Sequence, residues 1–175
     1  MDGGPRLGRA PPGINALARH ANYKFTNSFP YLLNRVGVRI AALFDERIAS
    51  YGVTMPMYRV LAALRERREQ RLSDLSDMTT IETSTLSRLV GAMKRKGLVS
   101  RRRPEDNGRT VAINLTAKGR SLVDELIPIV VHFEEVAVRN RSASEVQWIN
   151  RALAEAYDCL NDLEAEIRGA GATRS

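Results

Sequence analysis

The stretch that decides the fold runs from Glu82 to Leu115 and reads ETSTLSRLVGAMKRKGLVSRRRPEDNGRTVAINL. Its first half repeats apolar residues at the spacing of a helix, and its last residues alternate them at the spacing of a strand. We predict a helix from about Glu82 to Lys96, stopped by Gly97, and then a β-hairpin turning at Asn107-Gly108. The two predicted strands of the hairpin cover residues 98–103 and 111–115.

The predicted helix has two unlike faces. One is apolar and carries Leu86, Leu89, Val90 and Met93. The opposite face carries small or basic residues, namely Ser84, Arg88, Gly91 and Arg95. A helix that enters the major groove of DNA needs such a surface, slim enough to approach and equipped with donors for base edges. We therefore expect the DNA contacts of this helix to come from Thr83, Ser84, Thr85, Ser87, Arg88 and Arg95.

Positive charge is concentrated in the same stretch. The 175-residue chain has 27 Lys and Arg against 20 Asp and Glu, a net charge of +7. Between Glu82 and Arg109 eight cations face three anions, so this segment alone contributes +5. Taken alone, a run of charged residues is usually a solvated face. Binding to phosphates, however, needs cations concentrated in one place, as they are here. In the hairpin, we expect phosphate or minor-groove contacts from Arg101, Arg102, Arg103 and Arg109.

Helices flank this stretch on both sides. Two predicted helices, at about 54–67 and 73–78, precede it and complete the order helix, short helix, helix, hairpin of a winged helix-turn-helix over residues 51–115. Residues 14–50 hold further helices: a short one can form within residues 14–29, and a strong one runs from about Pro30 to Ala49. Residues 116–168 hold two more, from Thr116 to about Arg139 and from Ser142 or Ser144 to about Ile167. Residues 1–13 and 169–175 are rich in Gly, and we predict flexible tails there.

The flanking helices are longer than a lone winged helix needs. The helix that starts at Thr116 is apolar on more than one face, with Ile127, Ile129, Val130 and Val131 almost contiguous. A monomer would expose part of this surface, which favours burial against a partner chain. The alternative is a thick monomeric core.

Five stretches resemble the MarR family of bacterial transcription regulators. They are Arg71–Met78, Glu82–Val90, Lys96–Arg102, Asp106–Arg109 and Leu115–Gly119. The resemblance implies a mainly α fold, a winged helix-turn-helix with flanking dimerisation helices that interlock in a homodimer. Such a two-fold dimer prefers a pseudo-palindromic operator in double-stranded DNA. Arg109 matches the wing arginine that these proteins insert into the minor groove, whereas Asn107 stands where the family usually has Asp.

The resemblance also implies a small aromatic or anionic effector, such as a CoA thioester, bound between the dimer helices and the DNA-binding lobe. The candidate ligand residues are Tyr31, Arg35, Tyr58 and Arg59, and His20, Lys24 and Arg39 add positive charge. Arg35 and Arg39 share a helix face and can clamp a carboxylate or phosphate. The alternative is that these side chains are amphipathic surface or dimer-contact residues.

Other kinds of function find little support in the sequence. No run of about 18 apolar residues and no apolar signal-peptide core is present, so we expect a cytoplasmic, nucleoid-associated protein without membrane contact. His20 and His132 lack ligand-spaced partners, and no catalytic motif occurs, so we expect no enzyme, no cofactor and no metal. We expect Cys159 to be a buried, inert thiol and Trp148 to serve packing.

Together these features predict a ligand-responsive, sequence-specific DNA-binding regulator. The expected mode is repression, with release from a palindromic operator by a small aromatic acid or its thioester. The alternative is a constitutive architectural DNA-binding protein without an effector. A strong preference for one palindromic site would separate the two.

Overall fold

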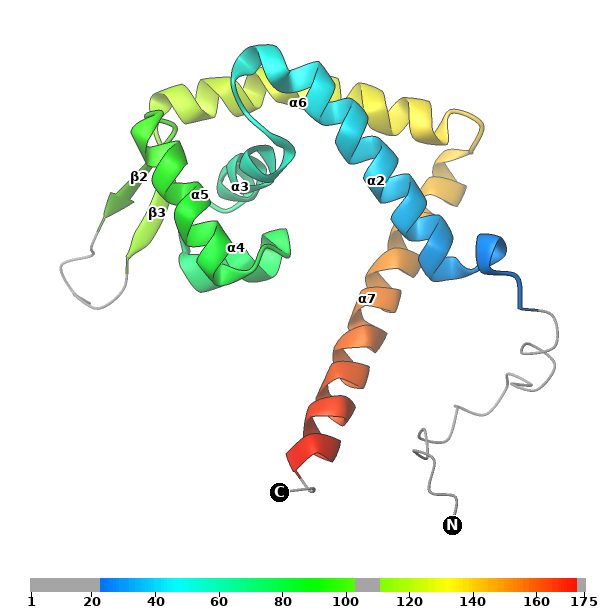
Figure 1. The fold of residues 1–175 in the computed structure, drawn as a ribbon. Coiled ribbons are helices and arrows are strands. Elements are labelled where there is room, and N and C mark those ends of the chain that lie inside the picture. Colours follow the sequence, from blue (N-terminus) through cyan, green and yellow to red (C-terminus); the bar gives the residue numbers. More distant parts are fainter. Residues whose placement is uncertain (1–22, 103–110, 173–175) are drawn as a thin grey trace. The chain divides into compact units, whose positions relative to one another are not determined.

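The computed structural model describes residues 23–102 and 111–172, with side chains up to Gly169 (Figure 1). The chain divides into two compact units, one up to Val123 and the other from Asp124 onward. The first unit contains η1 (Phe25–Asn27), α2 (Phe29–Ile48), η2 (Ala49–Tyr51), α3 (Met55–Glu66), β1 (Glu69–Arg71), α4 (Leu72–Thr79), α5 (Thr83–Arg95), β2 (Val99–Arg102) and β3 (Ala112–Leu115). Helix α6 (Ala117–Val138) crosses into the second unit, which also contains α7 (Ala143–Ala172).

These elements confirm the predicted fold class, which is mainly α with a winged helix-turn-helix. Each helix expected between residues 30 and 139 is present, and its ends differ from the prediction by one residue. Helix α7 runs to Ala172, whereas the sequence predicts an end near Ile167 and a tail from Gly169. A Gly is tolerated near the end of a long helix at a cost of about 1 kcal/mol, so Gly169 does not stop it. Residues 1–13, the other predicted tail, lie outside the described residues.

The small sheet has three strands where the sequence predicts two. Its order is β1-β3-β2, and both pairings are antiparallel. The extra strand, β1, has the sequence Glu-Gln-Arg and shows no apolar alternation, because only Gln70 at its centre faces the core. Gln70 pairs with Ile113 and is 4% exposed, and its amide donates to the Arg67 carbonyl at 3.3 Å. Segment β1 is therefore a strand because it pairs with β3, since its own sequence carries no strand pattern.

The core of the first unit is built from the predicted apolar faces. Helix α3 contributes Val60, Leu61 and Leu64, each fully buried. Helix α5 contributes Leu86, Val90 and Met93, also fully buried, while Leu89 is half-buried. The predicted alternation of β3 is wrong in one respect, because the neighbours Ala112 and Ile113 are both buried. Ala112 is small enough to be covered on the outer face of a short strand.

The turns around α5 explain two residue choices. Gly97 ends the helix with a φ of 71°, and the amides of Gly97 and Leu98 donate to the carbonyls of Lys94 and Met93, a Schellman motif that favours Gly. Between α4 and α5 the turn passes through Thr80, a non-Gly residue with a φ of 54°. The Ser76 hydroxyl holds this turn by donating to the Ile81 carbonyl at 2.7 Å.

The start of α6 is fastened to the end of α5 through backbone groups. The Thr116 hydroxyl lies 2.6 Å from the Gly97 carbonyl, and it accepts the amide of Gly119 at 3.0 Å as a helix cap. Lys118 donates to the Lys96 carbonyl at 3.1 Å. The backbone at Gly119 approaches the backbone at Leu98 so closely that a Cβ on residue 119 would lie 2.0 Å from the Leu98 carbonyl oxygen. Only Gly fits there without a shift of the backbone.

Helix α2 is buried only toward its C-terminal end, by Phe44 and Ile48. There the Phe44 ring meets the Tyr58 ring of α3 edge to face, with centroids 5.0 Å apart. The Asp45 carboxylate accepts the backbone amide of Met55 and so holds the first turn of α3 against α2. Most of the other large apolar residues of α2 are exposed, among them Leu32, Leu33, Val36, Val38 and Leu43, while Ile40 is half-buried.

Candidate nucleic-acid interface

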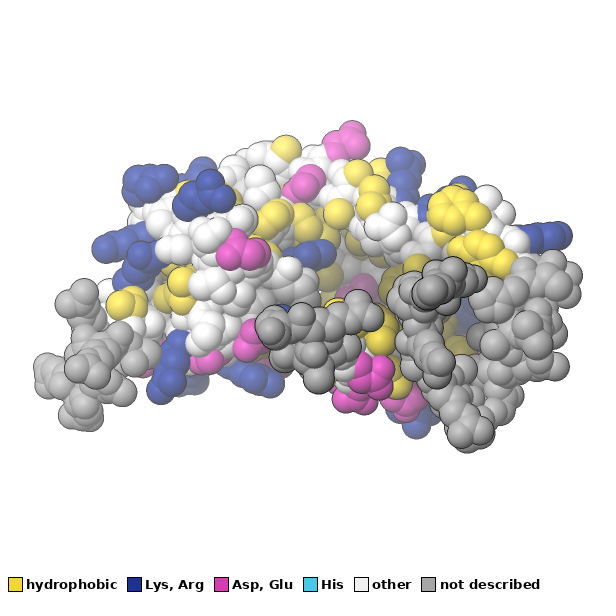
Figure 2. Space-filling view, turned by 60° about the horizontal axis from the view of Figure 1, so that its bottom comes forward, with side chains coloured by type: hydrophobic (Ala, Val, Ile, Leu, Met, Phe, Trp, Pro, Cys, Tyr) yellow, Lys and Arg dark blue, Asp and Glu magenta, His cyan; other side chains and the backbone are white. Residues whose placement is uncertain are grey.

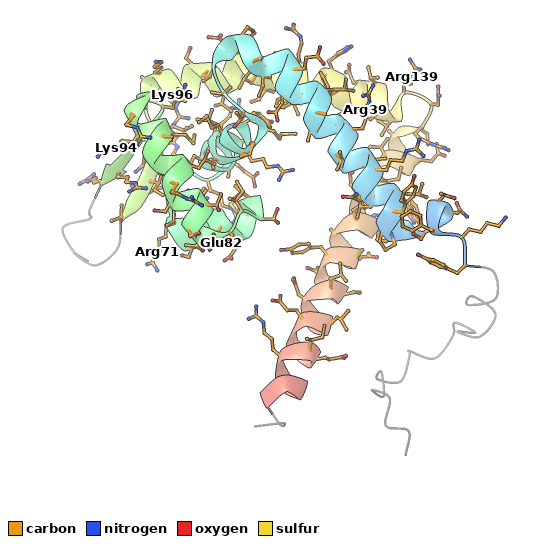
Figure 3. All side chains as sticks on the ribbon, viewed as in Figure 1. Arg39, Arg71, Glu82, Lys94, Lys96 and Arg139 are labelled. Carbon is orange, nitrogen blue, oxygen red and sulfur yellow. The ribbon has the colours of Figure 1, made fainter. Side chains whose placement is uncertain are left out.

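Helix α5 presents the slim face that the sequence predicts. Thr83, Ser84, Thr85, Arg88 and Arg95 are exposed, and Ser87 is half-buried. The opposite face is occupied by the core, so the helix is held with its hydroxyls outward. Figure 2 shows Lys and Arg side chains gathered over the end of the unit that carries α5 and β2 (left). The two ends of α5 differ in charge, with Glu82 at its start and Lys94 and Lys96 at its end (Figure 3).

Glu82 has a role that the sequence prediction missed. The sequence places it inside the helix, whereas in the structure it is the residue before the helix and has a non-helical backbone, with a φ of −54° and a ψ of 137°. Its carboxylate accepts the amides of Ser84 at 2.9 Å and Thr85 at 3.0 Å, and it also accepts the Ser84 hydroxyl. The hydroxyl of Ser84 and these two amides lower the pKa of Glu82 to about 2. Glu is a less usual N-cap than Ser, Thr, Asp or Asn, which is why the sequence pattern did not reveal it.

The side chains of the first two turns of α5 are arranged by local contacts. The Thr83 hydroxyl lies 3.1 Å from the hydroxyl of Ser76 on α4. The Arg88 guanidinium lies 3.4 Å from the Thr85 hydroxyl, one turn earlier on the same face. These contacts leave Arg88 exposed beside hydroxyl groups, as a residue that reads base edges requires. That these residues contact DNA stays a prediction.

Of the four hairpin arginines that the sequence predicts as DNA contacts, two lie in the described part of the chain. Arg101 and Arg102 are exposed on β2. The Arg101 guanidinium donates to the Ser87 carbonyl of α5 at 3.0 Å. Arg103 and Arg109, both predicted DNA contacts, lie outside the described residues.

A pocket of about 390 Å³ opens between α3 and the end of α4. It is lined by Tyr58, Arg59, Ala62, Ala63, Glu66, Met78, Thr79 and Thr80. Two of the four predicted ligand residues, Tyr58 and Arg59, are therefore brought together. The other two, Tyr31 and Arg35, do not line it: the Tyr31 ring packs on Phe25 with centroids 4.5 Å apart, and Arg35 is exposed on α2. The part of the pocket from α4 was not predicted, because Met78, Thr79 and Thr80 carry no ligand-binding pattern.

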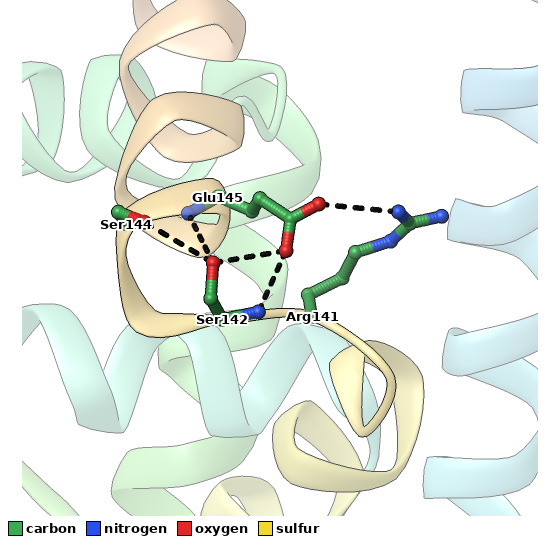
Figure 4. Close-up of polar contacts among 4 residues, drawn as sticks. All are labelled: Arg141, Ser142, Ser144 and Glu145. Carbon is green, nitrogen blue, oxygen red and sulfur yellow. Dashed lines mark hydrogen bonds and ion pairs between the residues drawn. The ribbon is translucent and has the colours of Figure 1, made fainter.

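The second unit exposes a stripe of large apolar residues along α7. It consists of Leu153, Tyr157, Leu160, Leu163 and Ile167, whereas the exposed Trp148 lies on another face of the helix. The helix starts at a capping box, in which Glu145 accepts the amide and hydroxyl of Ser142 and the Ser142 hydroxyl accepts the amide of Glu145 (Figure 4). The pKa of Glu145 is lowered mainly by the hydrogen bond from the Ser142 amide, and then by the Ser142 hydroxyl and by Arg141. Ser142, and not Ser144, is thus the cap.

Two predictions about α7 are wrong within the single chain. Cys159, expected to be buried, is exposed, and Trp148, expected to pack, is 63% exposed. At about 100° per residue, both side chains lie on a different face of α7 from Leu160 and Ile167, and this face is exposed as well. Among the residues that the structure describes, no three His, Cys, Asp or Glu side chains gather where they could hold a metal ion. No helix in the same part of the chain is long and apolar enough to cross a membrane.

Comparisons with known proteins agree with this architecture. A family model described as the transcriptional regulator SarA/Rot matches residues 42–126, which run from α2 into α6. A solved MarR family regulator from Silicibacter pomeroyi superposes with a TM-score of 0.72 at 26% identity, covering 79% of this chain and 93% of that one. The chain is a MarR-type transcriptional regulator. The MarR-type chain is therefore a DNA-binding protein of the winged-helix class, as the sequence predicts.

Two further relatives are regulators with a known mode of action or a known effector. The repressor NicR of Pseudomonas putida is 25% identical to this MarR-type chain over 123 residues, which are 70% of this chain and 78% of NicR. BpsR of Bordetella bronchiseptica, whose DNA binding is regulated by 6-hydroxynicotinic acid, superposes with a TM-score of 0.71 at 26% identity. That comparison covers 78% of this chain and 97% of BpsR. These relatives are transcriptional regulators, a class of protein that is not enzymatic.

Proposed function

We propose that this MarR-type chain is a homodimeric repressor that binds a pseudo-palindromic operator and is released from it by a small aromatic acid or its thioester. The observation that carries the proposal is the exposed hydroxyl face of α5 beside the arginines of β2. A helix with this face fits the major groove, while the basic hairpin supplies phosphate contacts. An operator-bound protein of this kind works in the cytoplasm, associated with the nucleoid.

The exposed apolar stripes of α2 and α7 support a homodimer. Leu153 and Ile167, at the two ends of the α7 stripe, are 38% and 64% exposed. A soluble protein rarely leaves such a continuous stripe in water, and a second copy of the chain offers the same stripe in return. Two copies place two α5 helices on half-sites about one DNA turn apart, which is why a pseudo-palindrome is expected.

The decisive experiment selects the preferred DNA site. The purified protein is incubated with a pool of randomised duplexes, and the retained duplexes are sequenced. Enrichment of one pseudo-palindrome supports a sequence-specific regulator, whereas retention without sequence preference supports the alternative of a constitutive architectural protein. The selected duplex then serves as the operator in the tests that follow.

Arg88 is the residue of α5 best placed to read a base. We expect Arg88→Ala to weaken binding to the selected duplex by about 1–3 kcal/mol and to relax the sequence preference at one position of each half-site. Arg151→Ala, which removes an exposed arginine from α7, is the matched control and should bind as the unaltered protein does. A fluorescence-anisotropy titration measures both, and unchanged affinity of Arg88→Ala contradicts the assignment.

The pocket between α3 and α4 is the proposed effector site. Its volume suits a small ligand, and it combines an aromatic ring, Tyr58, with one cation, Arg59, and one anion, Glu66. Because BpsR responds to 6-hydroxynicotinic acid, this compound is the first probe and benzoate the second. We expect one of them to release the selected duplex, and Arg59→Gln to abolish the release. Neither Tyr31 nor Arg35 lines this pocket, so their substitution tests whether a second part of the site is built from α2.

A further inference from the structure

The base of the wing, β2, carries one arginine on each face of the strand. Successive side chains of a strand point to opposite faces, so Val99 and Arg101 share one face and Arg102 lies on the other. Val99 is 2% exposed, and Ile113, the register partner of Arg101, is 1% exposed. Arg101 therefore leaves the strand on the face that covers the core.

On that face the Arg101 side chain reaches α5. Its Nη2 donates to the Ser87 carbonyl oxygen at 3.0 Å, across 14 positions of the sequence. A carbonyl inside a helix has a second lone pair for such a donor, and a charged donor makes a stronger hydrogen bond than a neutral one. Ser87 stands directly before Arg88, so the bond is made at the part of α5 that is proposed to meet DNA.

We propose that Arg101 is a positioning residue that fastens the wing to α5, so that the two elements meet DNA in a fixed relation. The inference rests on the proposed function, because it assumes that both elements bind DNA. A wing held by its two strands alone would lose conformational freedom when DNA orders it, and this loss would weaken binding. With the bond to Ser87, the base of the wing is already ordered in the free protein. Arg101 thus supports affinity by positioning the wing, in place of the phosphate or minor-groove contact that the sequence predicts for it.

The neighbouring Arg102 provides a matched control. Arg101→Gln and Arg102→Gln remove the same charge from adjacent positions on opposite faces of β2. A residue that neutralises a phosphate adds about one to the slope of log affinity against log salt concentration, whereas a residue that only positions the wing adds nothing to it. The salt slope therefore distinguishes the two roles, and thermal unfolding checks that both variants are folded.

The experiment titrates each variant against a mixed-sequence duplex about three helical turns long at several salt concentrations. We expect Arg101→Gln to bind about tenfold more weakly with an unchanged salt slope. Hydrogen exchange without DNA should be faster than in the unaltered protein at the amides of β2 and β3, and unchanged in α3. Arg102→Gln should leave this exchange unchanged.

Three outcomes overturn the proposal. They are a salt slope that falls by about one in Arg101→Gln, an affinity equal to that of the unaltered protein, and exchange at β2 and β3 that does not change. If the unaltered protein binds no DNA, the proposed function fails. The exchange comparison then still decides whether Arg101 fastens the wing, so the two failures are distinguishable.

Discussion

Helices α5 and α7 both carry an apolar stripe at helical spacing, but only the stripe of α5 is buried within the chain. Leu86, Val90 and Met93 are fully buried, whereas Leu160 and Ile167 of α7 are 58% and 64% exposed. The same periodic signal therefore has two different outcomes. Periodicity tells which side chains need burial, but it does not tell whether the covering surface comes from the same chain.

The largest effect is expected at Gly119, where two backbone segments of the first unit approach closely. A Cβ at this position would lie 2.0 Å from the Leu98 carbonyl oxygen, so Gly119→Ala forces two backbone segments apart. We expect a loss of about 3 kcal/mol in the free energy of unfolding, measured by urea denaturation.

Gly37 on α2 is the matched control for this substitution. It has no atom within 4 Å of an added Cβ, and it lies in a helix where Ala is the better residue. Gly37→Ala should therefore raise stability by about 0.5–1 kcal/mol. An equal effect of the two substitutions would contradict the close approach at Gly119.

The second prediction concerns the exposed stripe of α7. Leu160→Glu places a charge on this stripe, and we expect it to weaken self-association of the chain by about 2 kcal/mol. The neighbouring Asn161→Glu adds the same charge to an exposed polar position and should leave self-association unchanged. Sedimentation velocity over a range of concentrations measures both variants. If Leu160→Glu associates as strongly as the unaltered protein, the stripe is not the dimer surface.

The smallest effect concerns the cap of α5. Because the folded chain holds the pKa of Glu82 near 2, below its ordinary value of 4.5, the cap stabilises the folded state fully above pH 4.5. This contribution is lost as the pH falls from 4.5 toward 2, since the unfolded chain takes up the proton first. Thermal unfolding of Glu82→Gln should therefore depend less on pH in this window than that of the unaltered protein. Glu135→Gln, a substitution outside the cap, controls for the loss of one carboxylate, and equal pH dependence of the two variants would contradict the assignment.

Much of the lobe was predictable because its signals are local. The apolar face of α5, its stop at Gly97 and the basic hairpin all depend on residues close together in the sequence. The contact of Arg101 with Ser87 was not predictable, because it joins a strand to a helix and depends on which face of β2 the side chain leaves. The pocket was half predicted for the same reason: Tyr58 and Arg59 stand out on α3, but its other wall comes from α4.

The sheet order β1-β3-β2 also indicates the order in which the strands form during folding. Strands β2 and β3 are neighbours along the chain, so their hairpin closes a short loop and can form early. Strand β1 must pair Gln70 with Ile113, far away in the sequence, and has no apolar pattern to guide it. It can become a strand only after β3 is in place. The segment that joins α3 to α4 is therefore expected to order late, when the hairpin already offers an edge.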